Sequence, residues 1–145
     1  MRNAIIFLDS GDTLVDESTE VRIKGDVVDH AEFFPGIKEV LFQLKNAGFR
    51  VALVADGLVE SFDNIYQQHE METYFEVRAI SETVGVCKPA GEMFKTAMEK
   101  MNLEEADKKY IIMIGNNLER DIVGANRMGI TSVLAGYSPR YRMKP

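Results

Sequence analysis

The stretch FLDSGDTLVDES, residues 7 to 18, ends an apolar run on an aspartate and continues with a turn and a threonine. The run AIIFLD, which overlaps its start, has no polar residue before Asp9, and this is typical of a strand covered on both faces. Such a strand presents the Asp9 carboxylate at its end, where a carboxylate can attack phosphorus. A phosphoryl-transfer site of this kind would have a second carboxylate two residues later, but the sequence has Gly11 there.

Beyond this stretch, strand-like and helix-like segments alternate. The further predicted strands are RVALVADG, VRAI, YIIMIGNN and ITSVLAG. The predicted helices are PGIKEVLFQLKNAGF, VESFDNIYQQHEM, AGEMFKTAMEKMN and LERDIVGANRMG. Because strands and helices alternate with short connections, the sequence predicts an α/β fold, namely a three-layer Rossmann-like parallel sheet with helices on both faces.

Two of the predicted helices indicate which side faces the core. The first begins with Pro35 and stops at Gly48, and its apolar residues recur at helical spacing. Its predicted inward residues are Ile37, Val40, Leu41 and Leu44. The inward residues of the helix AGEMFKTAMEKMN are Met93, Phe94, Ala97 and Met101. Both helices are therefore expected to cover a face of the sheet.

The segment between the first strand and the first helix has a different pattern. EVRIKGDVVDHA predicts a small hairpin that turns at Lys24-Gly25-Asp26. We expect residues 15–34 to form a loop and a hairpin flap, too short to be a full cap domain. The chain is long enough for one core and too short for two, so residues 1–145 are expected to form a single domain.

Composition excludes several classes of partner. The formal net charge of −6 argues against nucleic-acid binding, and no apolar run approaches the roughly 18 residues of a membrane span. A single cysteine and the absence of a visible signal peptide predict a cytoplasmic location. Cys87 is expected to be a small buried side chain. Arg140, Arg142 and Lys144 form a basic cluster that is expected to be solvated, with a partner contact as the alternative.

Polar residues stand at four predicted strand ends, and the topology of a parallel sheet brings such ends to one edge. They are Asp9, the pair Ala55 and Asp56, the segment up to Lys88, and Asn116 with Asp121. Phosphoryl oxygens in a transition state need positive charge and amide donors, which Lys88 and the backbone of residues 10–13 could supply. Asn116 and Asp121 carry oxygen ligands of the type that Mg²⁺ accepts.

This arrangement resembles the haloacid dehalogenase-like (HAD) hydrolase superfamily over essentially the whole chain. FLDSGDTL stands where the Asp-x-Asp-x-Thr motif belongs, and VALVADG where a strand ends in Ser or Thr. VGVCKPAGEMF is close to Val-Gly-x-x-Lys-Pro. IGNNLERDIVGANRMGI is similar to the last motif, Gly-Asp-x-x-x-x-Asp followed by a Gly-Ala-x-x-x-Gly helix. Each match is weak alone, but four in order on predicted strand ends are specific.

The resemblance implies a role for each matching residue. Asp9 would be the nucleophile, Lys88 would hold the phosphoryl group and neutralise Asp9, and Thr13 would orient the loop. Asp121 would bind metal directly or through water. The implied phosphate-binding residues are Ser10, Gly11, Asp12, Thr13, Ala55, Asp56 and Lys88. The implied metal ligands are Asp9, Gly11, Asn116 and Asp121, and the implied cofactor is weakly bound Mg²⁺.

Three positions depart from the pattern of the superfamily. Gly11 replaces the aspartate that protonates the leaving group and later activates water, and such a loss typically costs about 10²–10⁴ in rate. Ala55 replaces a hydroxyl that contacts a phosphoryl oxygen, at a similar cost. Asn116 replaces the first acidic metal ligand, so metal affinity should fall.

Three residues are candidates to replace the missing acid: Asp12, Asp56 and His30. Each has an alternative role, namely a turn or solvent-facing position for Asp12, a turn cap for Asp56 and surface exposure for His30. Asp16 and Glu17 are expected to be solvated, and His69 to be structural.

The sequence leaves three functions open. The first is a Mg²⁺-dependent phosphatase that forms an aspartyl phosphate on Asp9 and favours good leaving groups such as acyl or aryl phosphates. The second is a metal-independent hydrolase of the dehalogenase kind, which shares the departures at Gly11 and Asn116. The third is a phosphate-binding or scaffolding module without catalysis. The expected partner is a phosphorylated substrate, with a homo-oligomer covering the open site as a further possibility.

Overall fold

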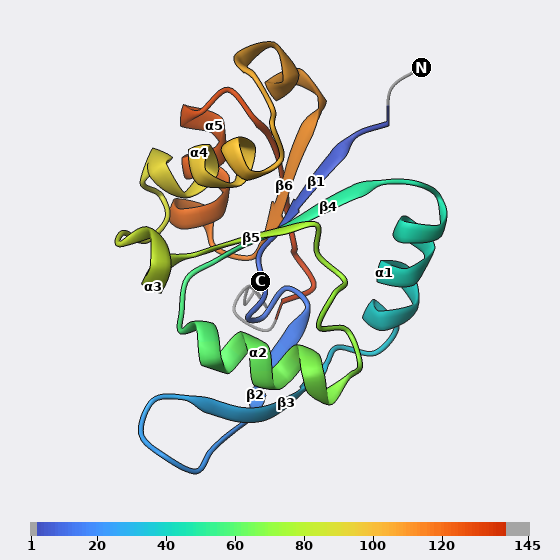
Figure 1. Ribbon diagram of the computed structural model, residues 1–145, viewed down its shortest axis with the longest axis vertical. Helices are drawn as coiled ribbons and strands as arrows, with labels where there is room; N and C mark the ends of the chain where they lie inside the picture. The colour runs from blue at the N-terminus through green and yellow to red at the C-terminus, as the bar shows by residue number, and fades with distance from the viewer. Residues whose placement is uncertain (1–2, 139–145) are drawn as a thin grey trace, which may run out of the picture.

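The computed structural model describes residues 3–138 and contains a parallel sheet of five strands in the order β5-β4-β1-β6-β7 (Figure 1). The strands are β1 (Ile5–Leu8), β4 (Arg50–Ala55), β5 (Val77–Ile80), β6 (Ile111–Gly115) and β7 (Thr131–Leu134). Leu8 lies opposite Leu53 of β4 and Ile114 of β6. The three central strands therefore end nearly in line, and the residues that follow them share one edge of the sheet.

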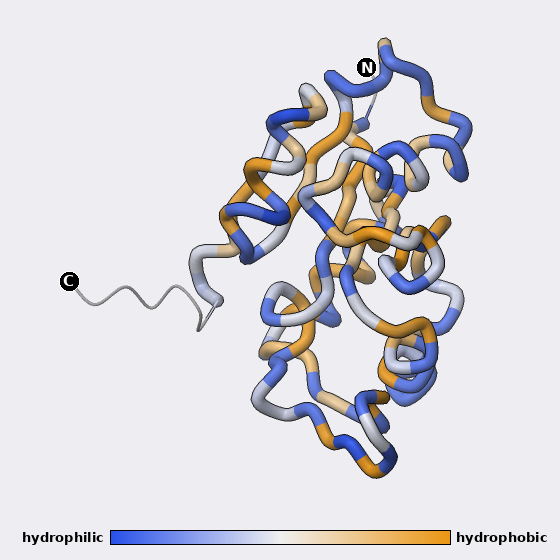
Figure 2. The backbone as a smooth tube through the Cα atoms, turned by 90° about the vertical axis from the view of Figure 1, so that its left-hand side faces the viewer, coloured by the Kyte–Doolittle hydropathy of each residue, from blue (hydrophilic) through white to orange (hydrophobic). Residues whose placement is uncertain are grey.

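Helices cover both faces of this sheet. On one face, α1 (Ile37–Asn46) and α2 (Val59–Gln68) pack against alternate strand residues such as Ile6 and Leu8. On the other, α4 (Gly91–Lys100) and α5 (Gly124–Arg127) pack against Ile5 and Phe7. Successive strand residues point to opposite faces, so a continuous apolar run fills both layers. Figure 2 shows hydrophobic segments in the interior and hydrophilic residues along much of the outer loops.

Shorter elements complete the fold. They are α3 (Ser81–Val84), the 3₁₀ helix η1 (Glu105–Tyr110) and the π-helical turn η2 (Leu118–Val123), which leads directly into α5. Leu103, which precedes η1, and Tyr110, its last residue, pack against the core cluster that contains Ile5 and Phe7. The described part of the chain has no helix long and apolar enough to cross a membrane.

A two-stranded antiparallel hairpin, β2 (Val15–Arg22) and β3 (Val28–Phe33), follows β1. Gly25 lies in its turn with φ 59°. The hairpin rests on α2, where the Val28 amide donates to Ser61 Oγ at 2.9 Å and Asn64 Nδ2 donates to the Val28 carbonyl at 2.9 Å. These bonds hold the hairpin beside the carboxyl edge of the sheet.

The predicted fold class is confirmed, and the inward residues predicted for α4 are all buried. Two predictions about single residues are wrong. Val40 is 49% exposed, because α1 buries a stripe centred on Leu41 and turns Val40 to solvent. Cys87 is exposed rather than buried, because it lies in the loop before Lys88. The basic cluster of Arg140, Arg142 and Lys144 lies outside the described residues.

Candidate active site

The centre of the carboxyl edge is a buried ammonium between two carboxylates. Lys88 Nζ donates to Asp9 Oδ1 at 3.0 Å, to Asp121 Oδ1 at 2.6 Å and to the carbonyl of Val54 at 2.7 Å. An ammonium has three hydrogens, so these three acceptors use all of them. The structure thus brings together Asp9, Lys88 and Asp121, and Lys88 must exchange a partner before it can contact another anion.

Burial and charge act in opposite directions on this cluster. Burial alone would lower the pKa of Lys88, but the carboxylates of Asp9 and Asp121 outweigh it and the pKa is raised. Burial raises the pKa of Asp121, and the Asp9 carboxylate adds to this while the ammonium opposes it. Lys88 is therefore charged at neutral pH, and the ionised cluster carries one net negative charge.

The loop after Asp9 is fixed by its own hydrogen bonds. The Asp12 amide donates to the Val15 carbonyl at 2.6 Å, and the Thr13 amide donates to the Ser10 carbonyl at 3.2 Å. The hydroxyls of Ser10 and Tyr66 share a hydrogen bond of 2.9 Å. The backbone amides of Asp12 and Thr13 thus already donate within the loop. Of the expected donors in residues 10–13, the amides of Ser10 and Gly11 are the ones left for a phosphoryl group.

Asp56 holds the segment that carries Lys88. Its Oδ1 accepts from the Lys88 amide at 2.9 Å, and its Oδ2 pairs with Arg120 Nη1 at 3.4 Å. The side chain of Asn117 caps the turn that carries Arg120 by accepting from the amides of Glu119 and Arg120. Both oxygens of Asp56 are engaged, so its role in this structure is to position Lys88.

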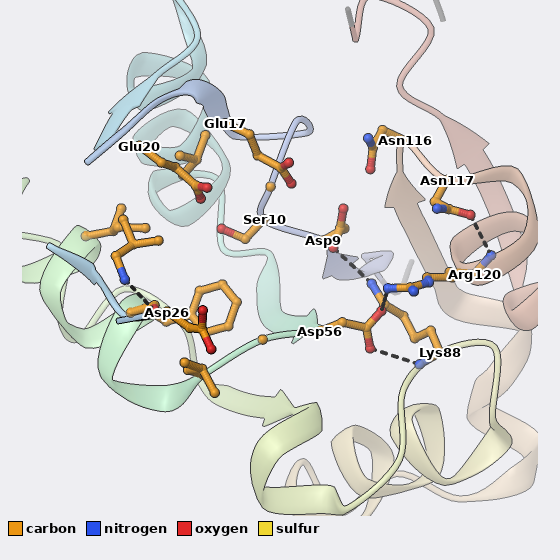
Figure 3. A pocket seen from close by; sticks show the side chains of 18 of the residues that line it. Asp9, Ser10, Glu17, Glu20, Asp26, Asp56, Lys88, Asn116, Asn117 and Arg120 are labelled. Carbon is orange, nitrogen blue, oxygen red and sulfur yellow. Dashed lines mark hydrogen bonds and ion pairs between the residues drawn. The ribbon is translucent and has the colours of Figure 1, made fainter. Parts of the chain in front are cut away.

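A cavity of about 430 Å³ opens between the sheet edge and the hairpin (Figure 3). Six acidic residues line it: Asp9, Glu17, Glu20, Asp26, Asp56 and Asp121. Three basic residues line it: Arg22, Lys88 and Arg120. Burial raises the pKa of Glu20, although the neighbouring Arg22 opposes this. The excess of acidic groups means that an anionic ligand would need a cation to accompany it.

The predicted site residues fall into two groups. Those that line the cavity are Asp9, Ser10, Gly11, Asp56, Lys88, Asn116 and Asp121. Those that stand behind the lining are Asp12, Thr13 and Ala55. Ala55 is buried at the end of β4, while Gly57 reaches the cavity in its place. Asp12 adopts φ 55° and its Oδ1 accepts from the Glu17 amide at 3.0 Å, which is a turn role.

None of the three candidates for the missing acid is placed for that work. Asp12 and Asp56 are held as described, and the exposed His30 pairs with Asp29 at 2.8 Å, away from the cavity lining. Sequence reasoning did not place Glu17, whose carboxylate lies against Gly11, or Arg120, which pairs with Asp56, at the site. The available signal for Glu17 was Gly11 itself, because a residue without a side chain leaves room for a neighbour.

The donor set fits a hard divalent cation in chemical type. The single hydroxyl hydrogen of Thr13 faces two acceptors, Asp9 Oδ2 at 3.1 Å and Asn116 Oδ1 at 3.4 Å, so one of these oxygens lacks that donor at any moment. Carboxylate and amide oxygens are ligands that Mg²⁺ accepts. Residues 3–138 contain no group of three or more His, Cys, Asp or Glu side chains arranged to hold a metal.

Comparison with known proteins gives consistent matches. A family model described as haloacid dehalogenase-like hydrolase matches residues 10–135. The glyceraldehyde 3-phosphate phosphatase of Pyrococcus abyssi is 34% identical over 104 residues, which cover 71% of this chain and 42% of that protein. The pyrophosphatase PpaX of Halalkalibacterium halodurans is 28% identical over 109 residues, which cover 75% of this chain and 49% of that protein. The chain thus spans less than half the length of these curated relatives.

Solved structures agree on the architecture. A HAD phosphatase from Thermococcus onnurineus has a TM-score of 0.75 to this chain at 15% identity. The likeness covers 90% of this chain and 85% of that one. At this level of identity, the comparison shows a shared fold.

Proposed function

The chain belongs to the haloacid dehalogenase-like hydrolase family, and on this premise we propose that it is a phosphatase in which Asp9 is the nucleophile. The observation that carries the proposal is the position of the Asp9 carboxylate, which lines the cavity while Lys88 and Thr13 hold one oxygen each. A carboxylate fixed in this way can form an aspartyl phosphate, which water then hydrolyses. The relatives named as phosphatases support a phosphorylated substrate.

The residues around Asp9 divide the remaining work. Lys88 pairs with Asp9 and orients it, and it would turn one donor to a phosphoryl oxygen when substrate enters. The amides of Ser10 and Gly11 would supply further donors to that group. Arg120, which is half exposed at the rim, would attract the anionic substrate.

A divalent cation completes the proposal, and Mg²⁺ is the one that these oxygens suit. Asp9, Asn116 and Asp121 would hold it, together with the backbone of Gly11. When bound, Mg²⁺ would offset the negative charge of the phosphoryl group and of the acidic lining. Because Asn116 contributes no charge, we expect weaker binding than at a site with three carboxylates.

The leaving group sets the substrate class. No side chain at position 11 can donate a proton, so phosphates with good leaving groups, such as acyl and aryl phosphates, should react fastest. The cavity of about 430 Å³ accepts more than the phosphoryl group alone.

The test uses purified protein with p-nitrophenyl phosphate and acetyl phosphate, with Mg²⁺ or with a chelator, beside Asp9→Asn. We expect turnover that requires Mg²⁺ and falls by at least about 10³ in Asp9→Asn, because the nucleophile is lost while the shape is kept. Turnover that survives in Asp9→Asn would come from a contaminant and would remove the proposal. Turnover of haloacids under chelation would instead favour the dehalogenase alternative.

A further inference from the structure

The space beside Gly11 is filled by a carboxylate from the hairpin. A Cβ atom built on Gly11 would lie 2.1 Å from Glu17 Oε1 and 3.0 Å from Glu17 Cδ. Gly11 is not among the glycines with positive φ, so its backbone is one that other residues adopt. The obstacle to a side chain at position 11 is therefore the Glu17 carboxylate and not backbone strain.

The local structure delivers Glu17 to this place. Gly11 forms a β-bridge with Val15, the first residue of β2, so the hairpin starts directly beside the Asp9 loop. The Glu17 amide then donates to Asp12 Oδ1 at 3.0 Å, which fixes the backbone of Glu17 against that loop. In Figure 3 the Glu17 carboxylate points into the cavity, on the side where Asp9 and Asn116 lie.

We propose that Glu17 is the acid and base of the reaction, supplied by the hairpin because position 11 has no side chain. This inference rests on the proposed phosphatase function. It assigns Glu17 as a catalytic residue that contacts the leaving oxygen and later the attacking water. It also widens the substrate class to alkyl phosphomonoesters, whose leaving groups require a proton.

The proposed reaction has two steps, phosphoryl transfer to Asp9 and hydrolysis of the aspartyl phosphate. In the first, an Asp9 oxygen bonds to phosphorus, the bond from phosphorus to the leaving oxygen breaks, and that oxygen keeps the electron pair and takes the proton of the Glu17 carboxyl. In the second, water bonds to phosphorus, its proton passes to the Glu17 carboxylate, and the Asp9–phosphorus bond breaks with the pair returning to Asp9. The products are an alcohol and inorganic phosphate, and both residues return to their starting states.

The first experiment compares leaving groups in Glu17→Gln. For an alkyl substrate such as glycerol phosphate, kcat/KM should fall by about 10²–10⁴, because the leaving oxygen receives no proton. For p-nitrophenyl phosphate, whose leaving group needs no acid, kcat/KM should fall by less than about tenfold. Slow second-step hydrolysis should also produce a burst of about one equivalent of p-nitrophenol. If Glu17 had a purely structural role, kcat/KM would fall alike for both substrates and no burst of p-nitrophenol would appear.

A second variant restores the acid at its usual position. Gly11→Asp combined with Glu17→Ala frees the space and places a carboxylate on residue 11, so activity toward glycerol phosphate should return to within about tenfold of the wild type. The matched control is Asp29→Asn, which also replaces a carboxylate by an amide on the same hairpin but lies outside the cavity lining. This variant should leave kcat/KM unchanged for both substrates.

The outcomes separate the two proposals. Suppose that wild-type turnover depends on Asp9. If kcat/KM in Glu17→Gln then falls equally for both substrates, or does not fall, the role of Glu17 is overturned and the phosphatase function stands. No turnover of either substrate by the wild type, or turnover that survives in Asp9→Asn, overturns both. Failure of the double variant to recover, when it is folded by circular dichroism, counts against Glu17 as the replacement of a residue-11 acid.

Discussion

One buried ammonium holds together residues that are far apart in the sequence. Lys88 is 2% exposed and joins Asp9, which follows β1, to Asp121, which lies in the turn after β6. Two carboxylates in a buried site repel each other, and each would lose its solvation without the charge between them. The ammonium is thus needed for the fold of the site.

Lys88→Met should show this requirement directly. Removing one partner of a buried ion pair typically costs about 3–5 kcal/mol, and we expect a loss of that size at pH 7.5. Without the opposing ammonium, the pKa of Asp121 should rise further above its usual value. A carboxyl group whose pKa is raised in the folded state favours folding at low pH, and this contribution is lost as pH rises. The loss of unfolding free energy in Lys88→Met should therefore be smaller at pH 5 than at pH 7.5.

Urea unfolding followed by circular dichroism at the two pH values measures this prediction. Lys95→Met is the control, because Lys95 is exposed on α4 and its loss should change stability by no more than about 0.5 kcal/mol. An equal deficit for Lys88→Met at both pH values would contradict the account, since it would mean that the two carboxylates do not repel.

The sequence predicted the positions of those site residues that directly follow a strand of the sheet. Asp9 and Asn116 directly follow buried parallel strands, so their meeting at one edge follows from topology alone. Glu17 was not predictable in this way, because its position depends on where the hairpin starts. The sequence predicted a turn at the correct residues but did not show that β2 begins at Val15, only four residues after Gly11.

At the scale of elements, the hairpin of β2 and β3 forms one wall of the cavity and is attached to α2 by several polar contacts. The Val28 amide donates to Ser61 Oγ, and the Ala31 amide donates to Gln68 Oε1. Both Val28 and Ser61 are buried, so water has little access to either group. The position of the hairpin over the site therefore depends on these bonds.

Ser61→Ala should loosen the hairpin without unfolding the sheet. The buried Val28 amide would lose its acceptor, which costs about 1–3 kcal/mol. We expect faster hydrogen exchange at amides of residues 28–33 and unchanged exchange in β1 and β4, because the two-stranded unit opens locally. Ser132→Ala serves as the control, since Ser132 bonds to Asn126 on the far side of the sheet. Uniformly faster exchange in all strands would show that the hairpin does not open on its own.

The elements themselves were more predictable than their surfaces. The three central strands are nearly continuous apolar runs, and the short connections of the sheet permit few topologies. The face of α1 was harder to predict, because the spacing placed both Val40 and Leu41 inward, whereas only Leu41 is buried. The short helices α3 and η1 carry no periodic signal and were missed.

At the scale of the whole molecule, charge decides which ligands enter the site. The chain has a formal charge of −6, and the cavity has twice as many acidic as basic side chains in its lining. An anion therefore meets an unfavourable field unless a cation accompanies it. A divalent cation and a phosphate-like anion should consequently bind together much better than either binds alone.

Thermal unfolding with Mg²⁺ and beryllium fluoride tests this coupling without relying on turnover. A ligand pair present at about 100 times its Kd stabilises the folded state by about 2.7 kcal/mol, which for a chain of this size raises Tm by roughly 5–10 °C. Either component alone should raise Tm by less than about 2 °C, because the anion lacks compensation and Asn116 weakens the cation site. Asp9→Asn should abolish the joint effect, since the anion then has no carboxylate to bind. A full shift with beryllium fluoride alone would show that Lys88 and Arg120 suffice to hold the anion, and the acidic lining would then not require a metal.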